Sequence, residues 1–281
     1  MSKVAIVTDS SPYIPEQIIK ENKIHVVPLT VIWGEENFYD GVDITPVEFY
    51  QRLEKAKVMP STSQPSVADF EVLFRSLHKE GYDILAILIS EELSGTISSA
   101  TQAKKMLPEA NIEIVNSRTL AMGLGFLVLA AARAANQGAS LHECKRLVEK
   151  SLEKVGVIFV LDTLEFLHRG GRIGVAKRFM GTLLNVKPVL AIDNGLVVPL
   201  DSVRTQKKAL EKIVDLIDEK TQDQKNIRLA TLHANNPKTA QFVLDLALEK
   251  IPAVEQVFSE VSPVIGTHAG PGAVGLAYIY D

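Results

Sequence analysis

The run Ile84-Leu85-Ala86-Ile87-Leu88-Ile89 is followed, after four residues, by the hydroxyl-rich segment Ser94-Gly95-Thr96-Ile97-Ser98-Ser99. A continuous apolar run of this length predicts a strand that is buried on both faces, which is typical of the centre of a parallel sheet. The residues that follow it predict a helix over 94–107. A strand that leads into a helix is the repeating unit of α/β proteins, so this stretch predicts an α/β fold.

The same alternation extends from this unit to both sides. Strands are predicted at 4–7, 25–33 and 112–115, and helices from Pro12 with Ser11 as its cap, from Thr45, over 67–79 with Ser66 as its cap, and over 120–135. The segment Thr45-Pro46-Val47-Glu48 is a capping box with proline at the first helical position. Together these elements predict a three-layer α/β/α domain with a mainly parallel sheet over residues 1–155.

The second half of the chain has a different pattern. Asp193-Asn194-Gly195 lies between two apolar runs and predicts a hairpin, because Asn-Gly supplies the positive φ angles of a tight turn. Around it, strands are predicted at 157–161, 228–232, 254–259 and 273–280, and helices from Ser140 with Glu143 in its capping box, and near 175–184, 206–219 and 237–249. Hairpins mixed with helices predict a second α/β domain with a mixed sheet over residues 156–281.

The composition is that of a soluble globular protein with room for two domains: 281 residues, 46% hydrophobic and 23% charged. Its net charge of −4 argues against a nucleic-acid-binding protein. The single cysteine, Cys144, is interpreted as a packed helical residue. The start of the chain shows no signal peptide, and its longest uncharged stretch, 119–132, is shorter than the roughly 20 residues that cross a bilayer. We therefore expect a cytoplasmic protein with no integral membrane association.

A glycine-rich segment lies near the C-terminus: Ile265-Gly266-Thr267-His268-Ala269-Gly270-Pro271-Gly272-Ala273-Val274-Gly275. Glycine lets the backbone approach a ligand closely and proline stiffens the chain, so the segment predicts a rigid ligand-facing loop around His268. A glycine-rich turn between two C-terminal strands, with a satisfied histidine, is the alternative.

Several blocks in a fixed order resemble the DegV family. They are Thr8-Asp9-Ser10-Ser11, Ser61-Thr62-Ser63-Gln64-Pro65-Ser66, the Ser94 block, Arg169-Gly170-Gly171-Arg172-Ile173, Lys187-Pro188-Val189-Leu190 and His268-x-Gly-Pro-Gly. The resemblance extends from residue 4 to residue 279. It implies the two-domain DegV-like (EDD) fold and a non-catalytic protein that binds a long-chain fatty acid in a buried tunnel between the domains. It also implies that the protein presents the carboxylate to the catalytic subunit of a fatty acid kinase, for acyl-phosphate formation.

The resemblance places Thr62, Ser94, Gly95 and His268 at the fatty-acid carboxylate. The residue types suit this role, because a carboxylate taken out of bulk water needs several hydrogen bonds, which hydroxyls can donate. Gly95 would let the backbone approach, and the N-terminus of the following helix favours an anion. The alternatives are that Ser94 is a simple helix cap and that Thr62 is a loop hydroxyl.

The hydrocarbon needs an apolar tunnel. Each buried methylene stabilises a bound chain by roughly 0.8 kcal/mol, so a chain of about fifteen gains on the order of 10 kcal/mol before the losses of association. Candidate lining residues are 126–129, 157–161, Phe166, Leu167, Met180, Leu183 and Leu184. Ordinary core packing explains each of them equally well.

A basic segment lies between Phe166 and Ile192, where five cations occur without an acidic residue. Arg169 and Arg172 lie on a glycine turn from which both guanidinium groups can reach outward, and Arg204 follows not far beyond. Arginine suits bidentate contacts with phosphate or carboxylate. With the resemblance, this segment is predicted to dock the kinase.

Other chemistries have weaker support in the sequence. It contains no Gly-x-x-x-x-Gly-Lys-Ser/Thr or Gly-x-Ser-x-Gly motif, and its histidines and lone cysteine have no metal-ligand spacing, so no cofactor or metal is expected. Asp9 is interpreted as a cap for backbone amides. Two alternatives remain open: an acyl hydrolase that uses Ser94 with His268 and Asp9, and a regulatory binding module for another small amphiphile.

Overall fold

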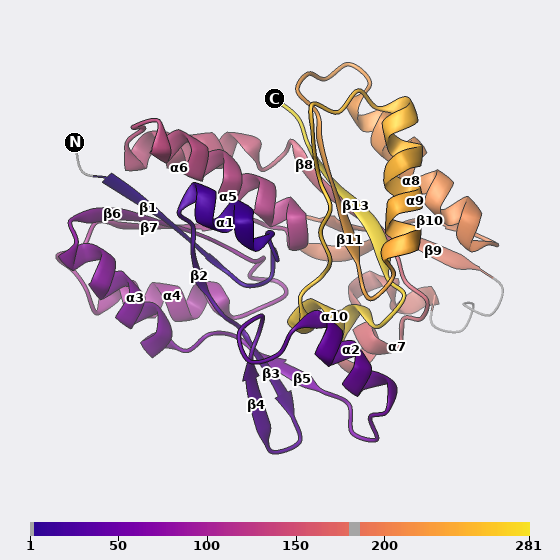
Figure 1. Ribbon diagram of the computed structural model, residues 1–281, viewed down its shortest axis with the longest axis horizontal. Coiled ribbons are helices and arrows are strands. Elements are labelled where there is room, and N and C mark those ends of the chain that lie inside the picture. Colours follow the sequence, from indigo (N-terminus) through magenta and orange to yellow (C-terminus); the bar gives the residue numbers. More distant parts are fainter. Residues whose placement is uncertain (1–2, 180–185) are drawn as a thin grey trace.

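The computed structural model describes residues 3–179 and 186–281 (Figure 1). Its first sheet is parallel throughout and has the strand order β2-β1-β6-β7. The strands are β1 (Lys3–Asp9), β2 (His25–Val27), β6 (Tyr82–Leu88) and β7 (Ile112–Asn116). As predicted from its apolar run, β6 lies inside the sheet between β1 and β7, and its side chains alternate between two hydrophobic clusters.

Helices cover both faces of this sheet. On one face lie α3 (Val67–Lys79) and α4 (Thr96–Lys105), and on the other lie α1 (Glu16–Asn22), α5 (Ala121–Asn136) and α6 (Leu141–Ser151) (Figure 1). The predicted three-layer arrangement with a mainly parallel sheet is therefore confirmed. The apolar helix α5 is buried along most of its length because it contacts β1 on one side and β8 and β13 of a second sheet on the other.

The second sheet is mixed, as predicted, with the order β10-β9-β8-β13-β11-β12. Its strands are β8 (Val155–Val160), β9 (Lys187–Asp193), β10 (Leu196–Val203), β11 (Arg228–His233), β12 (Glu255–Val257) and β13 (Val274–Ile279). Only the β11–β12 pair among these described strands is parallel. The helices α8 (Gln206–Thr221) and α9 (Pro237–Lys250) pack on the face away from α5. The hairpin at Asn194 and Gly195 is confirmed, with φ angles of 47° and 84°.

A third, antiparallel sheet was not predicted. It has the order β4-β3-β5 and consists of β3 (Thr30–Trp33), β4 (Glu36–Tyr39) and β5 (Ser61–Ser63). The prediction of one strand over 25–33 was wrong, because the chain leaves the first sheet at Pro28, which has no N–H for a strand ladder. Thr62 therefore lies in a strand that pairs with β3, and not in a loop.

Capping boxes predicted helix starts well. As predicted, Thr45 caps α2 (Pro46–Glu54), Ser66 caps α3 and Ser140 caps α6. Glu48 and Glu143 are the predicted acidic partners, and the partner of Ser66, Asp69, was not predicted. The predicted cap at Ser11 was wrong. Both the backbone N–H and the hydroxyl of Ser11 donate to Asp9 Oδ1, and α1 begins only at Glu16.

Three further boundaries differ from the prediction. Helix α4 begins at Thr96 with Gly95 at the N-cap, so Ser94 precedes the helix. The chain continues from the short helix α7 (Glu165–Arg169) to a 3₁₀-helix, η1 (Gly174–Phe179). An α-helix was expected near 175–184, and residues 180–184 of that prediction lie outside the described residues. The C-terminal glycine-rich segment begins with the helix α10 (Pro263–Ala269), capped by Ser262, so His268 lies in a helical turn and the predicted loop was wrong.

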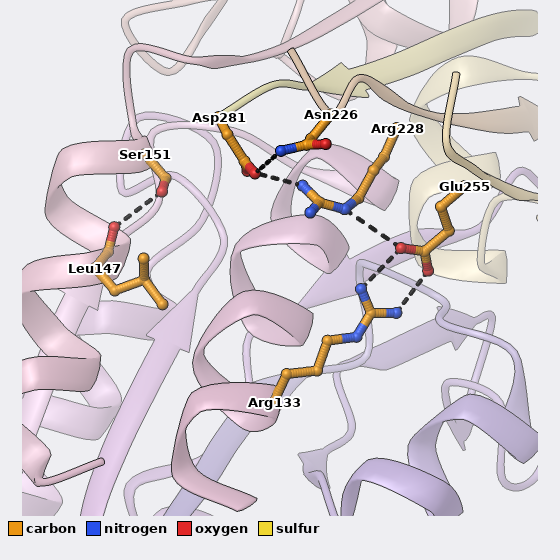
Figure 2. A network of polar contacts seen from close by, with 7 residues as sticks. All are labelled: Arg133, Leu147, Ser151, Asn226, Arg228, Glu255 and Asp281. Atoms are coloured by element: carbon orange, nitrogen blue, oxygen red, sulfur yellow. Dashed lines mark hydrogen bonds and ion pairs between the residues drawn. The ribbon is translucent and has the colours of Figure 1, made fainter. Parts of the chain in front are cut away.

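Polar contacts join α5 to the second sheet on the side where the chain ends (Figure 2). Arg133 of α5 makes two hydrogen bonds to the Glu255 carboxylate, at 2.8 and 2.5 Å. Arg228 Nε lies 3.4 Å from the same carboxylate, and its Nη1 lies 3.1 Å from Asp281. These residues tie α5 to the edge of the second sheet. The domain boundary at residue 155 stays a prediction.

Candidate functional site

A cavity opens between the elements of the first, second and third sheets. The cavity and its open mouth together contain about 900 Å³ of space that no protein atom fills. Among the described residues that line it, fifteen are apolar: Leu29, Ile89, Leu93, Leu120, Val157, Phe159, Leu161, Leu167, Val197, Leu232, Val261, Val264, Ile265, Ala269 and Ala273. Six are polar: Thr62, Ser63, Gln64, Ser94, Arg172 and His268.

The polar lining residues gather at one place because β5, α10 and the start of α4 meet there. Thr62 Oγ1 of β5 and His268 Nε2 of α10 form a hydrogen bond of 2.8 Å across 206 residues of sequence. Ser94 precedes α4, and its hydroxyl lies 2.9 Å from that of Thr96. The structure therefore brings together Thr62, Ser94 and His268, which the sequence analysis selected from three distant blocks.

Gly95 follows Ser94 in the chain and lies next to Gln64, another of the polar lining residues. The side-chain amide of Gln64 lies so close to Gly95 that a Cβ at this position would overlap it. An alanine at this position would therefore displace the exposed Gln64 side chain.

The three predicted docking arginines lie in different surroundings. Arg169 is exposed and pairs with Glu165 at 2.5 Å, and Arg204 is exposed beyond the end of β10. Arg172, however, is half-buried and turned toward the cavity, where its Nε donates to Leu93 O at 3.0 Å and its Nη1 to Gly170 O at 2.6 Å. The expectation that Arg169 and Arg172 reach outward together was wrong, because Arg172 satisfies these two carbonyls.

Burial and the nearby Arg172 charge lower the pKa of His268 to about 4. The imidazole is therefore neutral at pH 7, so Arg172 is the positive charge among the lining residues that the structure describes. The Nδ1 atom of His268 is buried and has no hydrogen-bond partner in the described part of the chain. It faces Gly170, where a Cβ would overlap it.

The predicted tunnel residues divide between the cavity and the core. Val157, Phe159 and Leu161 line the cavity, and Leu167 joins them, whereas Ile158 faces the opposite cluster under α8 and α9. Residues 126–129 lie in the buried middle of α5 and do not line this cavity, and neither does Phe166, which packs against Gly270. Met180, Leu183 and Leu184 lie outside the described residues.

The residues of the possible hydrolase triad have other partners. The Asp9 carboxylate is fully buried and accepts from the backbone N–H groups of Ser11 and Ile89, at 2.9 and 2.7 Å. This confirms its interpretation as a cap for backbone amides. His268 bonds to Thr62, and no carboxylate of the described residues holds its other nitrogen, so the hydrogen-bond chain of a triad is not assembled.

Other kinds of site find no support in the described parts of the chain. Residues 3–179 and 186–281 contain no group of three His, Cys, Asp or Glu side chains placed to hold a metal ion. None of the described helices has the length and hydropathy needed to cross a membrane.

Sequence reasoning missed several residues of the cavity. Leu29 lies between β2 and β3, Leu232 near the end of β11 and Val261 between β12 and α10, so the cavity draws them from segments far apart in the sequence. The role of Gly170 in packing against His268 was also missed. One signal for α10 was present, since Ser262-Pro263 has the cap and first-position residues of a helix start.

Comparison with known proteins identifies the family. The sequence profile of the DegV family, described as an uncharacterised protein family, matches residues 3–281. The chain belongs to the DegV family. It is 35% identical over 278 residues to the protein DegV of Bacillus subtilis (strain 168), with 99% of each chain covered. Among solved structures, a DegV family protein of Thermus thermophilus described for its fatty acid binding has a TM-score of 0.94, 33% identity and coverage of 99% and 100%. A stearic-acid-binding protein of Eubacterium ventriosum has a TM-score of 0.89, 27% identity and coverage of 100% and 98%.

Proposed function

We propose that this DegV family member binds a long-chain fatty acid, with the hydrocarbon in the cavity and the carboxylate at its polar end. The observation that carries the proposal is the division of the cavity lining: the apolar residues share one continuous space, and the polar ones gather around the bond between Thr62 and His268. An amphiphile with one anionic end and a long alkyl chain fits this division. The fatty-acid-binding relatives support the same ligand class.

The head-group chemistry follows from the state of His268. A buried N–H without an acceptor is rarer in proteins than an unused acceptor, so we assign the unpartnered Nδ1 as the bare nitrogen and Nε2 as the protonated one. Nε2–H then donates to Thr62 Oγ1, which leaves the hydroxyl hydrogen of Thr62 free to donate to the carboxylate. Ser94 supplies a second hydroxyl, and Arg172 supplies the positive charge at the same end of the cavity.

The protein has a non-catalytic role in this proposal. It is a cytoplasmic protein that presents the carboxylate to a separate kinase. A carboxylate oxygen attacks the γ-phosphorus of the ATP bound to that kinase, which gives acyl phosphate and ADP. The exposed guanidinium groups of Arg169 and Arg204 dock that kinase, while Arg172 stays with the head group. No cofactor is required of this chain.

Lipid analysis and binding test the ligand. Native mass spectrometry of the purified protein should find a bound acid of roughly sixteen to eighteen carbons, a length whose burial stabilises by on the order of 10 kcal/mol. In delipidated protein, Thr62→Ala and Ser94→Ala should each weaken palmitic acid binding by about 1–3 kcal/mol, because a charge-assisted hydrogen bond is lost. Ser98→Ala, an exposed hydroxyl of α4, is the matched control. A bare polypeptide that neither palmitic nor oleic acid binds or stabilises would refute the proposal.

Reconstituted phosphorylation tests the presentation step. Arg169→Glu and Arg204→Glu should suppress acyl-phosphate formation and leave palmitic acid binding unchanged, and the parent reaction should weaken with salt. Lys238→Glu, an exposed cation of α9, should leave the reaction unchanged. Normal phosphorylation of both arginine variants would remove these residues from the docking surface.

A further inference from the structure

A buried carboxylate that the proposed function does not use lies at the opposite end of α10 from His268. Asp40 is 2% exposed and follows β4 of the third sheet. Its Oδ2 accepts from the Ser10 hydroxyl at 2.6 Å, and its Oδ1 accepts from the backbone N–H of Val264, in the first turn of α10, at 3.2 Å. Ser262, the N-cap of α10, also favours the ionised form of Asp40 and lowers its pKa.

These hydrogen bonds have a consistent direction. The N–H of Leu29 donates to the Ser10 hydroxyl at 3.1 Å, and Ser10 in turn donates to Asp40. From the other side, the N–H of Val264 donates to Asp40, and the N–H of Ile265 donates to the Ser262 hydroxyl at 3.3 Å. The carboxylate thus accepts hydrogen bonds from residues at the end of β1 and at the start of α10. It therefore holds the start of α10 in place relative to β1.

The position of α10 determines the shape of the head-group site. Val264 and His268, and likewise Ile265 and Ala269, are spaced by four residues, so they lie on one face of the helix, and all four line the cavity. The opposite face carries Gly266, where a Cβ would overlap the Tyr50 hydroxyl of α2. Because α10 lies between α2 and the cavity, any slide or rotation of the helix moves His268 relative to Thr62.

We propose that Asp40 is a positioning residue for the head-group site: by holding the N-terminal turn of α10, it sets the place of His268 and hence the preference of the cavity for a carboxylate. This inference rests on the proposed function. The distance from Val264 to His268 along the helix is about 6 Å at 1.5 Å per residue, so a seven-residue helix transmits a displacement of one end to the other.

Asp40 ionises, so its contribution to stability depends on pH, which would not hold for an uncharged side chain at this position. Burial raises the pKa of Asp40 to about 7, against the hydrogen bonds that it accepts, and the nearby Asp9 contributes to the rise. The other ionisable groups that interact with this region, Tyr13, Tyr50 and Glu260, also have raised pKa values, so none of them ionises more readily than usual. The protonated Asp40 side chain is favoured in the folded protein, because its pKa there is about 7 and in the unfolded chain 3.8. Its contribution to the free energy of unfolding is therefore complete below pH 3.8 and is lost as the pH rises through about 7.

Two ligands that share a chain and differ in the head group test the proposal. In delipidated protein we would measure the dissociation constants of palmitic acid and of 1-hexadecanol. The ratio of the two constants reports head-group recognition alone. Asp40→Asn should reduce the preference for the acid about tenfold and shift the imidazole ¹⁵N resonances of His268. As the pH rises from about 4 to about 7, the unfolding free energy of the parent should fall relative to that of Asp40→Asn.

Asp69→Asn is the matched control, because Asp69 belongs to the capping box of α3, a helix that contributes no residue to the cavity. It should lower stability and leave both the ratio and the His268 resonances unchanged. Ser10→Ala, which removes one donor to Asp40, serves if Asp40→Asn does not fold. If the parent prefers the acid and Asp40→Asn and Ser10→Ala both retain that ratio, the positioning role is overturned. A parent that binds neither ligand would refute the proposed function instead.

Discussion

Gly170 shows how one missing methyl group can determine a ligand site. Its φ of −76° is open to any residue, so alanine would meet no backbone strain, but its Cβ would overlap His268 Nδ1. We predict that Gly170→Ala displaces the imidazole and weakens palmitic acid binding at least tenfold, as measured by calorimetry. The neighbouring Gly171 has φ of 72° and open space around its Cβ position, so Gly171→Ala should lower stability with little effect on affinity. Equal affinities for Gly170→Ala and the parent would contradict this packing.

The neutral imidazole gives a second prediction at the residue scale. Because burial and Arg172 lower the pKa of His268 to about 4, its side chain should stay unprotonated from pH 8 down to pH 5 in the unliganded protein. The contribution of His268 to the free energy of unfolding is therefore complete above pH 6.5, the pKa of the unfolded state, and is lost as the pH falls toward 4. Imidazole NMR shifts measure the protonation directly. A midpoint near 6.5 would show that the ring is solvated in solution.

Among the elements, the β9–β10 hairpin touches the first sheet through its turn. The carbonyl of Gly195 accepts from the buried Ser90 hydroxyl at 2.9 Å, and a Cβ at Gly195 would overlap that hydroxyl. Gly195→Ala should therefore lower the free energy of unfolding by about 2–3 kcal/mol, from the positive φ together with the overlap. Gly138→Ala has a comparable φ of 92° and no neighbour within 4 Å, so it should lose only about 1 kcal/mol. Urea unfolding measures both losses. Equal losses of unfolding free energy for Gly195→Ala and Gly138→Ala would show that the Cβ at residue 195 does not overlap Ser90.

The elements also show why some structure could be predicted and some could not. Helix starts at Thr45, Ser66 and Ser140 depend on hydrogen bonds within four residues, so the sequence carries their whole signal. The third sheet and α10 depend on contacts between distant segments, and the glycines that resembled a loop instead allow α10 to pack closely. The candidate site was only partly predictable for the same reason: its residues come from segments far apart in the sequence. Family blocks identified Thr62 and His268, but neither pattern nor spacing could place Arg172 inside the cavity.

At the scale of the whole molecule, the Arg133–Glu255 contact in Figure 2 ties α5, which covers one face of the first sheet, to the edge of the second sheet. The Arg133–Glu255 pair is bidentate and half-exposed, which makes it stronger than a typical surface pair. We predict that Arg133→Met lowers the free energy of unfolding by about 1 kcal/mol at low salt, and less at high salt. Lys20→Met, which removes a highly exposed pair with Glu16, should have no measurable effect. Thermal unfolding at low and high salt measures the stability of both variants. A loss for Arg133→Met that does not depend on salt would contradict the electrostatic origin of this stabilisation.

The central claim concerns one ligand in one orientation, and a crystal structure of the protein with palmitic acid tests it most directly. We predict that the alkyl chain lies along Val157, Phe159 and Leu161, with a carboxylate oxygen within hydrogen-bond distance of Thr62 Oγ1 and Ser94 Oγ. His268 Nε2 should remain bonded to Thr62. A carboxylate at the opposite end of the cavity, or a palmitic acid bound elsewhere on the protein, would contradict the account.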